Sequence, residues 1–111
     1  MTPEVIRYKI PAAQAEAFEK AYHQAEPILQ NSKHCLGYRL LQGVEEPENW
    51  ILILEWDSIE GHEQGFRKEP AFSEFFNLVK PFFQQIQEMK HYEEKTMNWR
   101  RNGDALKLKV K

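Results

Sequence analysis

The sequence predicts an α+β fold of the ferredoxin-like kind, in which one antiparallel sheet carries two helices on one face in the chain order β-α-β-β-α-β. Segments with the apolar patterns of strands occur at residues 5–10, 36–41, 49–56 and 87–93. Apolar residues at helical spacing fill the intervals 12–30 and 57–83. A chain of 111 residues has room for one domain with one modest core.

The first strand and the first helix follow directly from spacing. Residues 5–10 alternate, with Ile6, Tyr8 and Ile10 on one face. Pro11 ends the strand and suits the first turn of a helix. The helix then places four apolar residues on one face, namely Phe18, Tyr22, Ala25 and Leu29. We expect Pro27, inside this pattern, to kink or divide the helix.

The second half of the chain repeats the strand–helix–strand order of the first half, beginning with the strand at residues 49–56. Asp57 and Glu60 form a capping-box pattern, which predicts a helix that begins directly after Trp56. Ile59, His62 and Phe66 would share one face of this helix. Pro70 begins a further helix with a wide apolar stripe, made of Phe72, Phe75, Phe76, Val79, Phe82 and Phe83. The last strand, 87–93, contains Met89, His91 and Tyr92.

The third strand, NWILILEW at residues 49–56, has no polar face between Asn49 and Glu55. An antiparallel sheet with helices on one side normally alternates, because its second face meets water. Since no other element is left to cover that face, the sequence predicts a homodimer with the two sheets packed face to face. The alternative is an apolar patch that lies under the C-terminal tail.

Composition excludes several classes of protein. A single Cys excludes an internal disulfide and a Cys-based zinc cluster. No apolar run approaches the roughly 18 residues of a membrane span, and no signal peptide is evident, so we expect a cytoplasmic protein. Residues 95–111 carry six basic side chains against the one acidic Asp104, whereas the rest of the chain is acidic. We therefore expect a domain over 1–94, a basic tail or arm over 95–111, and neither nucleic-acid nor membrane binding.

Four motifs in this order resemble the antibiotic biosynthesis monooxygenase (ABM) domain family: C-L-G-Y-R-L from Cys35, E-W-D-S from Glu55, H-x-x-x-F-R from His62, and H-Y-E from His91. The resemblance covers residues 5–93. It implies a ferredoxin-like protomer in a dimeric α+β barrel. In some members of the family it also implies oxygenation of phenols or quinols without metal, flavin or haem, and in others degradation of haem.

The residues of the haem-degrading branch are not found at the corresponding positions. That branch uses an Asn on the first strand, where this sequence has Ile6. Its Trp position falls at Gly65 or Phe66, and its His position falls at Phe76. Haem degradation is therefore a minor alternative.

Cofactor-free oxygenation requires a flat aromatic pocket, a base for the phenolic proton and a group that stabilises the anion. His62 is the candidate base, because its ordinary pKa lies near neutral pH; a purely structural hydrogen bond to a carbonyl is the alternative. The candidate substrate-binding residues share an aromatic or cationic side chain, and they are Tyr8, Tyr22, Tyr38, Trp56, Phe66, Arg67, Phe72 and Phe76. Core packing, or a surface ion pair for Arg67, is the alternative role for each.

No spacing in the sequence predicts a metal or cofactor site, and we expect none. His91 is interpreted as structural, and His23 and His34 as facing solvent. The leading hypothesis is an ABM-type, cofactor-independent monooxygenase that acts on a small aromatic phenol, quinol or polyketide-type substrate. The alternative is a non-catalytic dimeric module that binds a small ligand or serves in stress.

Overall fold

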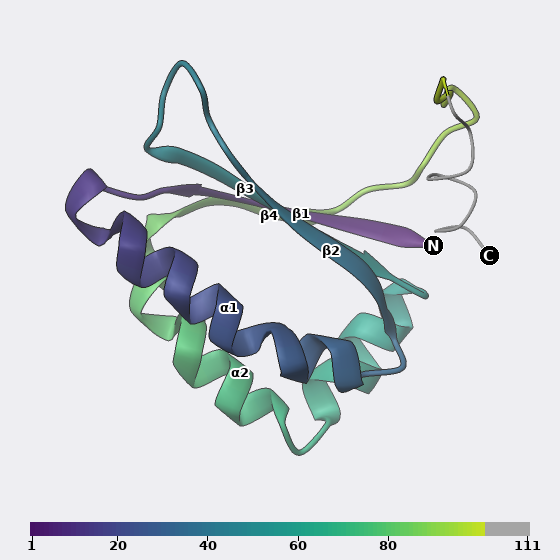
Figure 1. Ribbon diagram of the computed structural model, residues 1–111. Helices are drawn as coiled ribbons and strands as arrows, with labels where there is room; N and C mark the ends of the chain where they lie inside the picture. Colours follow the sequence, from purple (N-terminus) through teal and green to yellow (C-terminus); the bar gives the residue numbers. More distant parts are fainter. Residues whose placement is uncertain (102–111) are drawn as a thin grey trace.

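The structure is a computed structural model that describes residues 1–101. Four strands form one antiparallel sheet in the order β2-β3-β1-β4, and they are β1 (Thr2–Lys9), β2 (Cys35–Gln42), β3 (Asn49–Trp56) and β4 (Ile86–His91). The helices α1 (Ala15–Asn31) and α2 (Phe72–Val79) cover the same face of this sheet (Figure 1). The predicted fold class is confirmed. Residues 102–111, most of the predicted basic tail or arm, lie outside the described residues.

Residues 1–101 also contain four short helical turns: η1 (Ala12–Gln14), the π-helical turn η2 (Gly61–Gly65), η3 (Phe66–Lys68) and η4 (Lys80–Gln85). Of the two outcomes expected at Pro27, a kink or a division of the first helix, division is wrong, because α1 continues through Pro27 to Asn31. Leu29 follows Pro27 and is fully buried. Its packing holds the last turn of α1 against the sheet and offsets the roughly 3 kcal/mol that an interior proline costs.

The predicted capping box after β3 is also wrong. The Asp57 carboxylate accepts a hydrogen bond from Nδ1 of His34 instead, with the two atoms 2.8 Å apart. Ser58 caps this helical segment, since the backbone N–H of Gly61 donates to its hydroxyl at 2.8 Å. Ile59 faces solvent, with 43% of its surface exposed, and so does not share the buried face of His62.

The core lies between the sheet and α1, and Phe18 is at its centre. Phe18 is 0% exposed and packs edge-on against Tyr8, Tyr22, Trp50 and Phe82, with ring centroids 4.8–5.3 Å apart. Edge-to-face contacts of this kind add to the hydrophobic gain of burial. The first helix is thereby fixed on β1 and β3, where it forms one wall of the space beneath the sheet.

We expect Phe18→Ala to lower the free energy of unfolding by about 3–5 kcal/mol, because it removes a large buried ring and leaves a cavity. Val44→Ala is the matched control: Val44 is 88% exposed, and a surface substitution changes stability by about 0.5 kcal/mol or less. Urea unfolding followed by circular dichroism measures both. A loss below about 1 kcal/mol for Phe18→Ala would contradict the central position of this ring.

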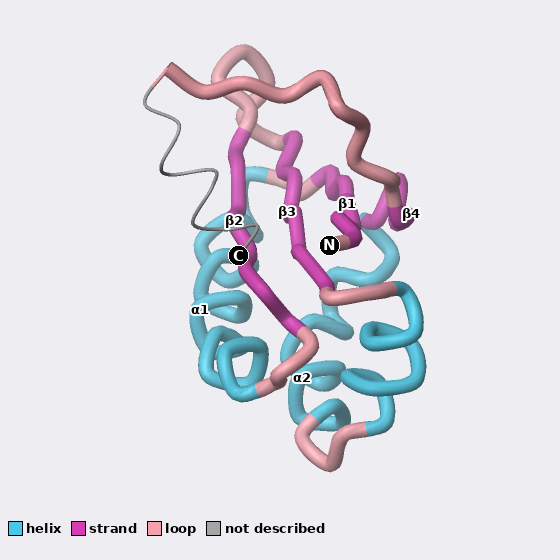
Figure 2. The backbone as a smooth tube through the Cα atoms, turned by 90° about the vertical axis from the view of Figure 1, so that its right-hand side faces the viewer, coloured by secondary structure: helices cyan, strands magenta, loops and turns pink. Residues whose placement is uncertain are grey.

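The opposite face of the sheet has no helix over it within residues 1–101, as the second view of the backbone shows (Figure 2). Along β3, Trp50, Leu52, Leu54 and Trp56 are buried against the helices, whereas Ile51 and Ile53 point to the other face and are only half-buried. The register places Leu41 beside Ile51 and Val5 beside Ile53. An apolar patch of Val5, Leu41, Ile51 and Ile53 thus spans β1, β3 and β2. No helix within the described residues has the length and apolar character to cross a membrane.

Candidate active site

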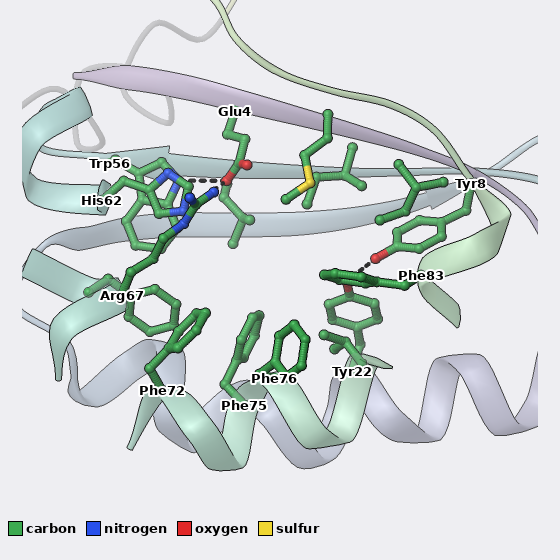
Figure 3. A pocket seen from close by; sticks show the side chains of 16 residues that line it. Glu4, Tyr8, Tyr22, Trp56, His62, Arg67, Phe72, Phe75, Phe76 and Phe83 are labelled. Carbon is green, nitrogen blue, oxygen red and sulfur yellow. Dashed lines mark hydrogen bonds and ion pairs between the residues drawn. The ribbon is translucent and has the colours of Figure 1, made fainter. Parts of the chain in front are cut away.

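A cavity of about 420 Å³ lies between the helix-covered face of the sheet and α2 (Figure 3). Side chains from β1, β3, β4, α1, α2 and the turns η2 to η4 line it. A volume of this size suits a small, drug-like molecule.

Aromatic rings form most of its wall. Phe72, Phe75 and Phe76 project from the first turns of α2 into the cavity, since positions three and four apart share one face of a helix. Phe66 meets Phe72 and Phe75 edge-on, with centroids 5.5 and 5.2 Å apart. Phe83, 40% exposed, closes the wall beside Phe76. A wall of ring faces and edges favours a flat aromatic ligand.

Polar side chains gather at one end of the cavity. Glu4 projects from β1 and is only 2% exposed. Its Oε1 accepts a hydrogen bond from the indole N–H of Trp56 at 3.0 Å and lies 3.7 Å from Nε2 of His62. The His62 ring stacks on Trp56, with centroids 4.3 Å apart and planes 9° from parallel. Nδ1 of His62 is 2.7 Å from Nε2 of His91, so the two imidazoles share a hydrogen bond.

The π-helical turn η2 carries His62 to this position. Gly61 and Gly65 flank the turn, and a Cβ at Gly65 would lie 2.4 Å from the ring of His34. The backbone of η2 therefore rests on the His34 ring, which Asp57 holds by its hydrogen bond. π-Turns occur frequently at functional sites. The expectation that His34 faces solvent is wrong, since its side chain is 21% exposed and supports η2.

Burial sets the charge of the polar end. It lowers the pKa of His62 to about 3, with the positive charges of Arg67 and His91 acting in the same direction, so His62 is a neutral imidazole at neutral pH. Burial also raises the pKa of Glu4, although the Trp56 hydrogen bond favours its ionised form. The Arg67 guanidinium points toward Glu4 and His62 from the cavity side (Figure 3). The end thus holds one neutral imidazole, one buried carboxyl group and one cation, the exposed guanidinium of Arg67.

Two tyrosines form the other polar end. The hydroxyls of Tyr8 and Tyr22 are 2.5 Å apart, and both side chains are buried. Burial raises the pKa of Tyr8 to about 12 and raises the pKa of Tyr22 well above its ordinary value. Both are therefore neutral phenols at physiological pH, and because one hydroxyl donates to the other, one hydroxyl hydrogen of the pair is left for a ligand.

The tyrosine pair predicts a pH dependence of stability. Because the pKa of Tyr8 in the folded protein exceeds its ordinary value of 10, the contribution of Tyr8 to the free energy of unfolding is complete below pH 10. This contribution is lost as the pH rises through about 12.

Tyr22→Phe leaves the Tyr8 hydroxyl buried without its partner and should lower the free energy of unfolding by about 1–3 kcal/mol. The double variant Tyr8→Phe/Tyr22→Phe should cost less than the two single variants together. Strict additivity in urea unfolding would contradict this coupling.

All but one of the sequence-predicted site residues line this cavity, and those that do are Tyr8, Tyr22, Trp56, His62, Phe66, Arg67, Phe72 and Phe76. Tyr38 lies outside it, beside a second cavity of about 360 Å³, where its hydroxyl donates to Glu26 at 2.6 Å. Arg67 makes no ion pair with any described residue. His23 is on the surface of α1, as expected, and contacts Glu26.

The sequence did not point to two of the polar residues, Glu4 and His91. Glu4 carried one usable signal: it shares the apolar face of β1 with Ile6 and Tyr8, and an acidic residue in such a position is unusual. His91 was interpreted as structural, yet it contacts His62 directly. The three residues Glu4, His62 and His91 each offer a metal-binding atom, and these atoms lie within 4.8 Å of one another.

The comparisons with known proteins agree with this architecture. Residues 1–78 match the family model for antibiotic biosynthesis monooxygenase. The uncharacterized protein YczJ of Bacillus subtilis is 28% identical over 94 residues, which cover 85% of this chain and 99% of YczJ. A Bordetella bronchiseptica structure that carries the same family name superposes with a TM-score of 0.70 at 22% identity, over 85% of this chain and 96% of that one.

A second solved structure superposes with the same TM-score. SnoaB of Streptomyces nogalater, a cofactor-independent oxygenase, superposes with a TM-score of 0.70 at 15% identity, over 88% of this chain and 97% of SnoaB. At these identities the structural matches show a common fold, whereas the family model covers more than half of the chain by sequence. The chain belongs to the antibiotic biosynthesis monooxygenase family.

Proposed function

We propose that the protein is a cofactor-independent monooxygenase that oxidises a small aromatic phenol or quinol, of the kind found in polyketides, with O2. The observation that carries the proposal is the neutral imidazole of His62 at the end of an aromatic cavity of about 420 Å³, beside a buried carboxyl group. Membership of the family and the likeness to SnoaB, a cofactor-independent oxygenase, support it.

The chemistry needs little from the protein once the phenol has lost its proton. A phenolate is a good one-electron donor, and transfer of an electron to O2 gives a radical pair that collapses to a ring hydroperoxide. Loss of water then leaves the quinone. A phenol and one O2 yield one quinone and one water, so one oxygen atom enters the ring and O2 accepts all four electrons.

The polar end supplies what this sequence of steps requires. His62 takes the phenolic proton, and the nearby Glu4 carboxyl group, when ionised, stabilises the imidazolium that forms. Arg67 points at the same region and stabilises the phenolate. The phenylalanines hold the ring and exclude water, which strengthens each of these interactions. At the far end, the Tyr8–Tyr22 pair donates its one remaining hydroxyl hydrogen to a second oxygen of a quinol.

The non-catalytic alternative predicts a different environment for His62. A purely structural histidine would be tied to a backbone carbonyl, in a pocket without other titratable groups. The His62 side chain contacts His91 and Glu4 instead, and Arg67, Tyr8 and Tyr22 also line the cavity. These groups favour catalysis over simple ligand binding.

We further propose that two copies of the chain form a homodimer through the face of the sheet that lacks helices. The apolar patch of Val5, Leu41, Ile51 and Ile53 supports this arrangement, since Leu41 is 42% exposed and the two isoleucines are half-buried in the single chain. A second copy would bury both patches at once, as a two-fold interface does.

The oxygenase proposal is tested by O2 uptake with a panel of hydroquinones, naphthols and anthrone-type phenols, in chelator-treated protein. We expect at least one compound to consume one O2 per molecule, and ¹⁸O2 to place one labelled atom in the quinone. Binding of several compounds without O2 uptake would overturn the oxygenase proposal and favour the ligand-binding module.

A further inference from the structure

Glu4, His62 and His91 form a cluster at the polar end of the cavity, and the sequence spacing of 58 and 29 residues between them gives no indication of it. We propose that this Glu–His–His cluster binds one divalent first-row transition-metal ion, of the type represented by Zn²⁺, Co²⁺ or Fe²⁺. The inference rests on the geometry of the cluster and stands independently of the proposed oxygenation.

The topology of the sheet brings the three residues together. Glu4 on β1 and His91 on β4 are directly opposite each other in the antiparallel register, and such pairs have Cβ atoms about 5 Å apart. Both side chains lie on the helix-covered face of the sheet. His62 approaches them from η2, and its Nδ1 is already 2.7 Å from Nε2 of His91. Two ligands thus come from neighbouring strands and the third from the turn above them.

The donor set is one that transition metals prefer. Two imidazoles and one carboxylate, with the remaining positions open, are typical of catalytic Zn²⁺ and of non-haem Fe²⁺ sites. Ligand atoms about 2.1 Å from a common ion lie roughly 3–4 Å apart, and the three candidate atoms are within 4.8 Å of one another. His91 is the least buried of the three, so it can make the small adjustment needed. The ion then replaces the proton shared by the two imidazoles.

The buried carboxyl group of Glu4 is an independent observation that favours a cation. Among the described residues it accepts one hydrogen bond, from Trp56, although only 2% of Glu4 is exposed. A buried carboxylate usually has a paired cation or binds a metal. The Trp56 indole also fixes the carboxylate by its hydrogen bond and fixes the His62 ring by stacking. In natural metal sites, residues that contact the ligand side chains rather than the ion orient those ligands in this way.

Arg67 acts against the ion. Its guanidinium is directed at the same end of the cavity and repels a second cation there. A variant that removes this charge should therefore bind the metal more tightly. Metal binding at a surface histidine would not depend on Arg67. The effect of this variant therefore distinguishes binding at the cluster from binding at the surface.

Metal binding and proton abstraction exclude each other at His62. An imidazole that holds a metal on one nitrogen keeps its hydrogen on the other, so it cannot act as a base. If the oxygenation also occurs as proposed, Zn²⁺ should inhibit it. The binding itself is measured without substrate, so failure of the metal site and failure of the oxygenase proposal remain distinguishable.

The test is a Co²⁺ titration of chelator-treated protein, followed by the visible ligand-field absorption of the ion, with Zn²⁺ as competitor. We expect one Co²⁺ per chain, displaced by Zn²⁺. Glu4→Gln and His91→Ala should each weaken binding by on the order of 10- to 100-fold or more, and Arg67→Met should strengthen it several-fold. Circular dichroism verifies that each variant is folded.

The matched control is His23→Ala. His23 is on the exposed surface of α1 beside Glu19 and Glu26. It is a surface histidine outside the cluster, so its loss should leave the titration unchanged. The proposal is overturned if no ion binds at one equivalent, if His91→Ala retains the wild-type affinity, or if His23→Ala abolishes the signal. Weaker binding in folded Arg67→Met would also overturn the placement of the ion beside that residue.

Discussion

His62→Gln should lower the turnover of a reactive hydroquinone by about 10²- to 10⁴-fold, the usual contribution of a positioned general base. Gln keeps most of the volume and a hydrogen-bonding group but cannot accept the phenolic proton. His62 is 4% exposed and stacked on Trp56, so its position is fixed before the substrate binds. Initial rates of O2 uptake measure the effect.

The low pKa of His62, about 3, has a consequence for this base. The imidazole is neutral at neutral pH, and in the empty cavity it is a weak base, because burial and the charge of Arg67 destabilise its imidazolium. In the proposed reaction, the phenolate that forms beside the imidazolium supplies the stabilising negative charge, and the Glu4 carboxyl group 3.7 Å away adds to it when ionised. Deprotonation is therefore coupled to binding of the aromatic ring, so the variant should lose kcat rather than binding.

His23→Gln is the control for this prediction, because His23 has a 68% exposed side chain on α1 and lies outside the cavity. Its turnover should equal that of the unaltered protein. Unchanged turnover in folded His62→Gln would remove His62 from the mechanism. Equal losses in both variants would show that the effect is not specific to the site.

The purified protein should elute at twice the mass of one chain, and Ile53→Lys should convert it to a monomer. Ile53 is at the centre of the apolar patch, paired with Val5 on β1 and with Arg39 on β2. A lysine there would place a charge in a desolvated interface next to other basic side chains, which costs several kcal/mol. Light scattering after size exclusion at micromolar concentration measures the mass.

Val44→Lys is the matched control for the dimer, since Val44 is 88% exposed in the loop between β2 and β3. It adds the same charge away from the sheet face and should leave the dimer intact. A monomeric unaltered protein would contradict the interpretation of NWILILEW as a strand covered on both faces. A dimeric Ile53→Lys would place the interface elsewhere.

The sequence predicted the fold well because its signals are local. Alternation in β1 and helical spacing in α1 are properties of short segments. The errors arose where tertiary contacts override local patterns. Pro27 stays inside α1 because Leu29 is packed beyond it, and Asp57 bonds His34 rather than capping the next helix.

Only the aromatic part of the site could be predicted from the sequence, because the polar part depends on tertiary contacts. Its aromatic members, such as Phe72 and Phe76, stand out by type and spacing. The polar end depends on the β1–β4 register, which places Glu4 opposite His91, and on the π-turn that carries His62 to both. Neither register nor π-turn can be inferred from one sequence, so the Glu–His–His cluster emerged only in three dimensions.

In the proposed mechanism, the polar end of the cavity removes a proton from the bound phenol. Absorption spectroscopy with a chromogenic nitrophenol that resists oxidation tests it most directly, in chelator-treated protein at a pH below the pKa of the free ligand. We predict that the ligand bound to the unaltered protein absorbs as the phenolate, and that the ligand bound to His62→Gln absorbs as the neutral phenol. A neutral phenol in both proteins, or no binding in the cavity, would contradict the claim.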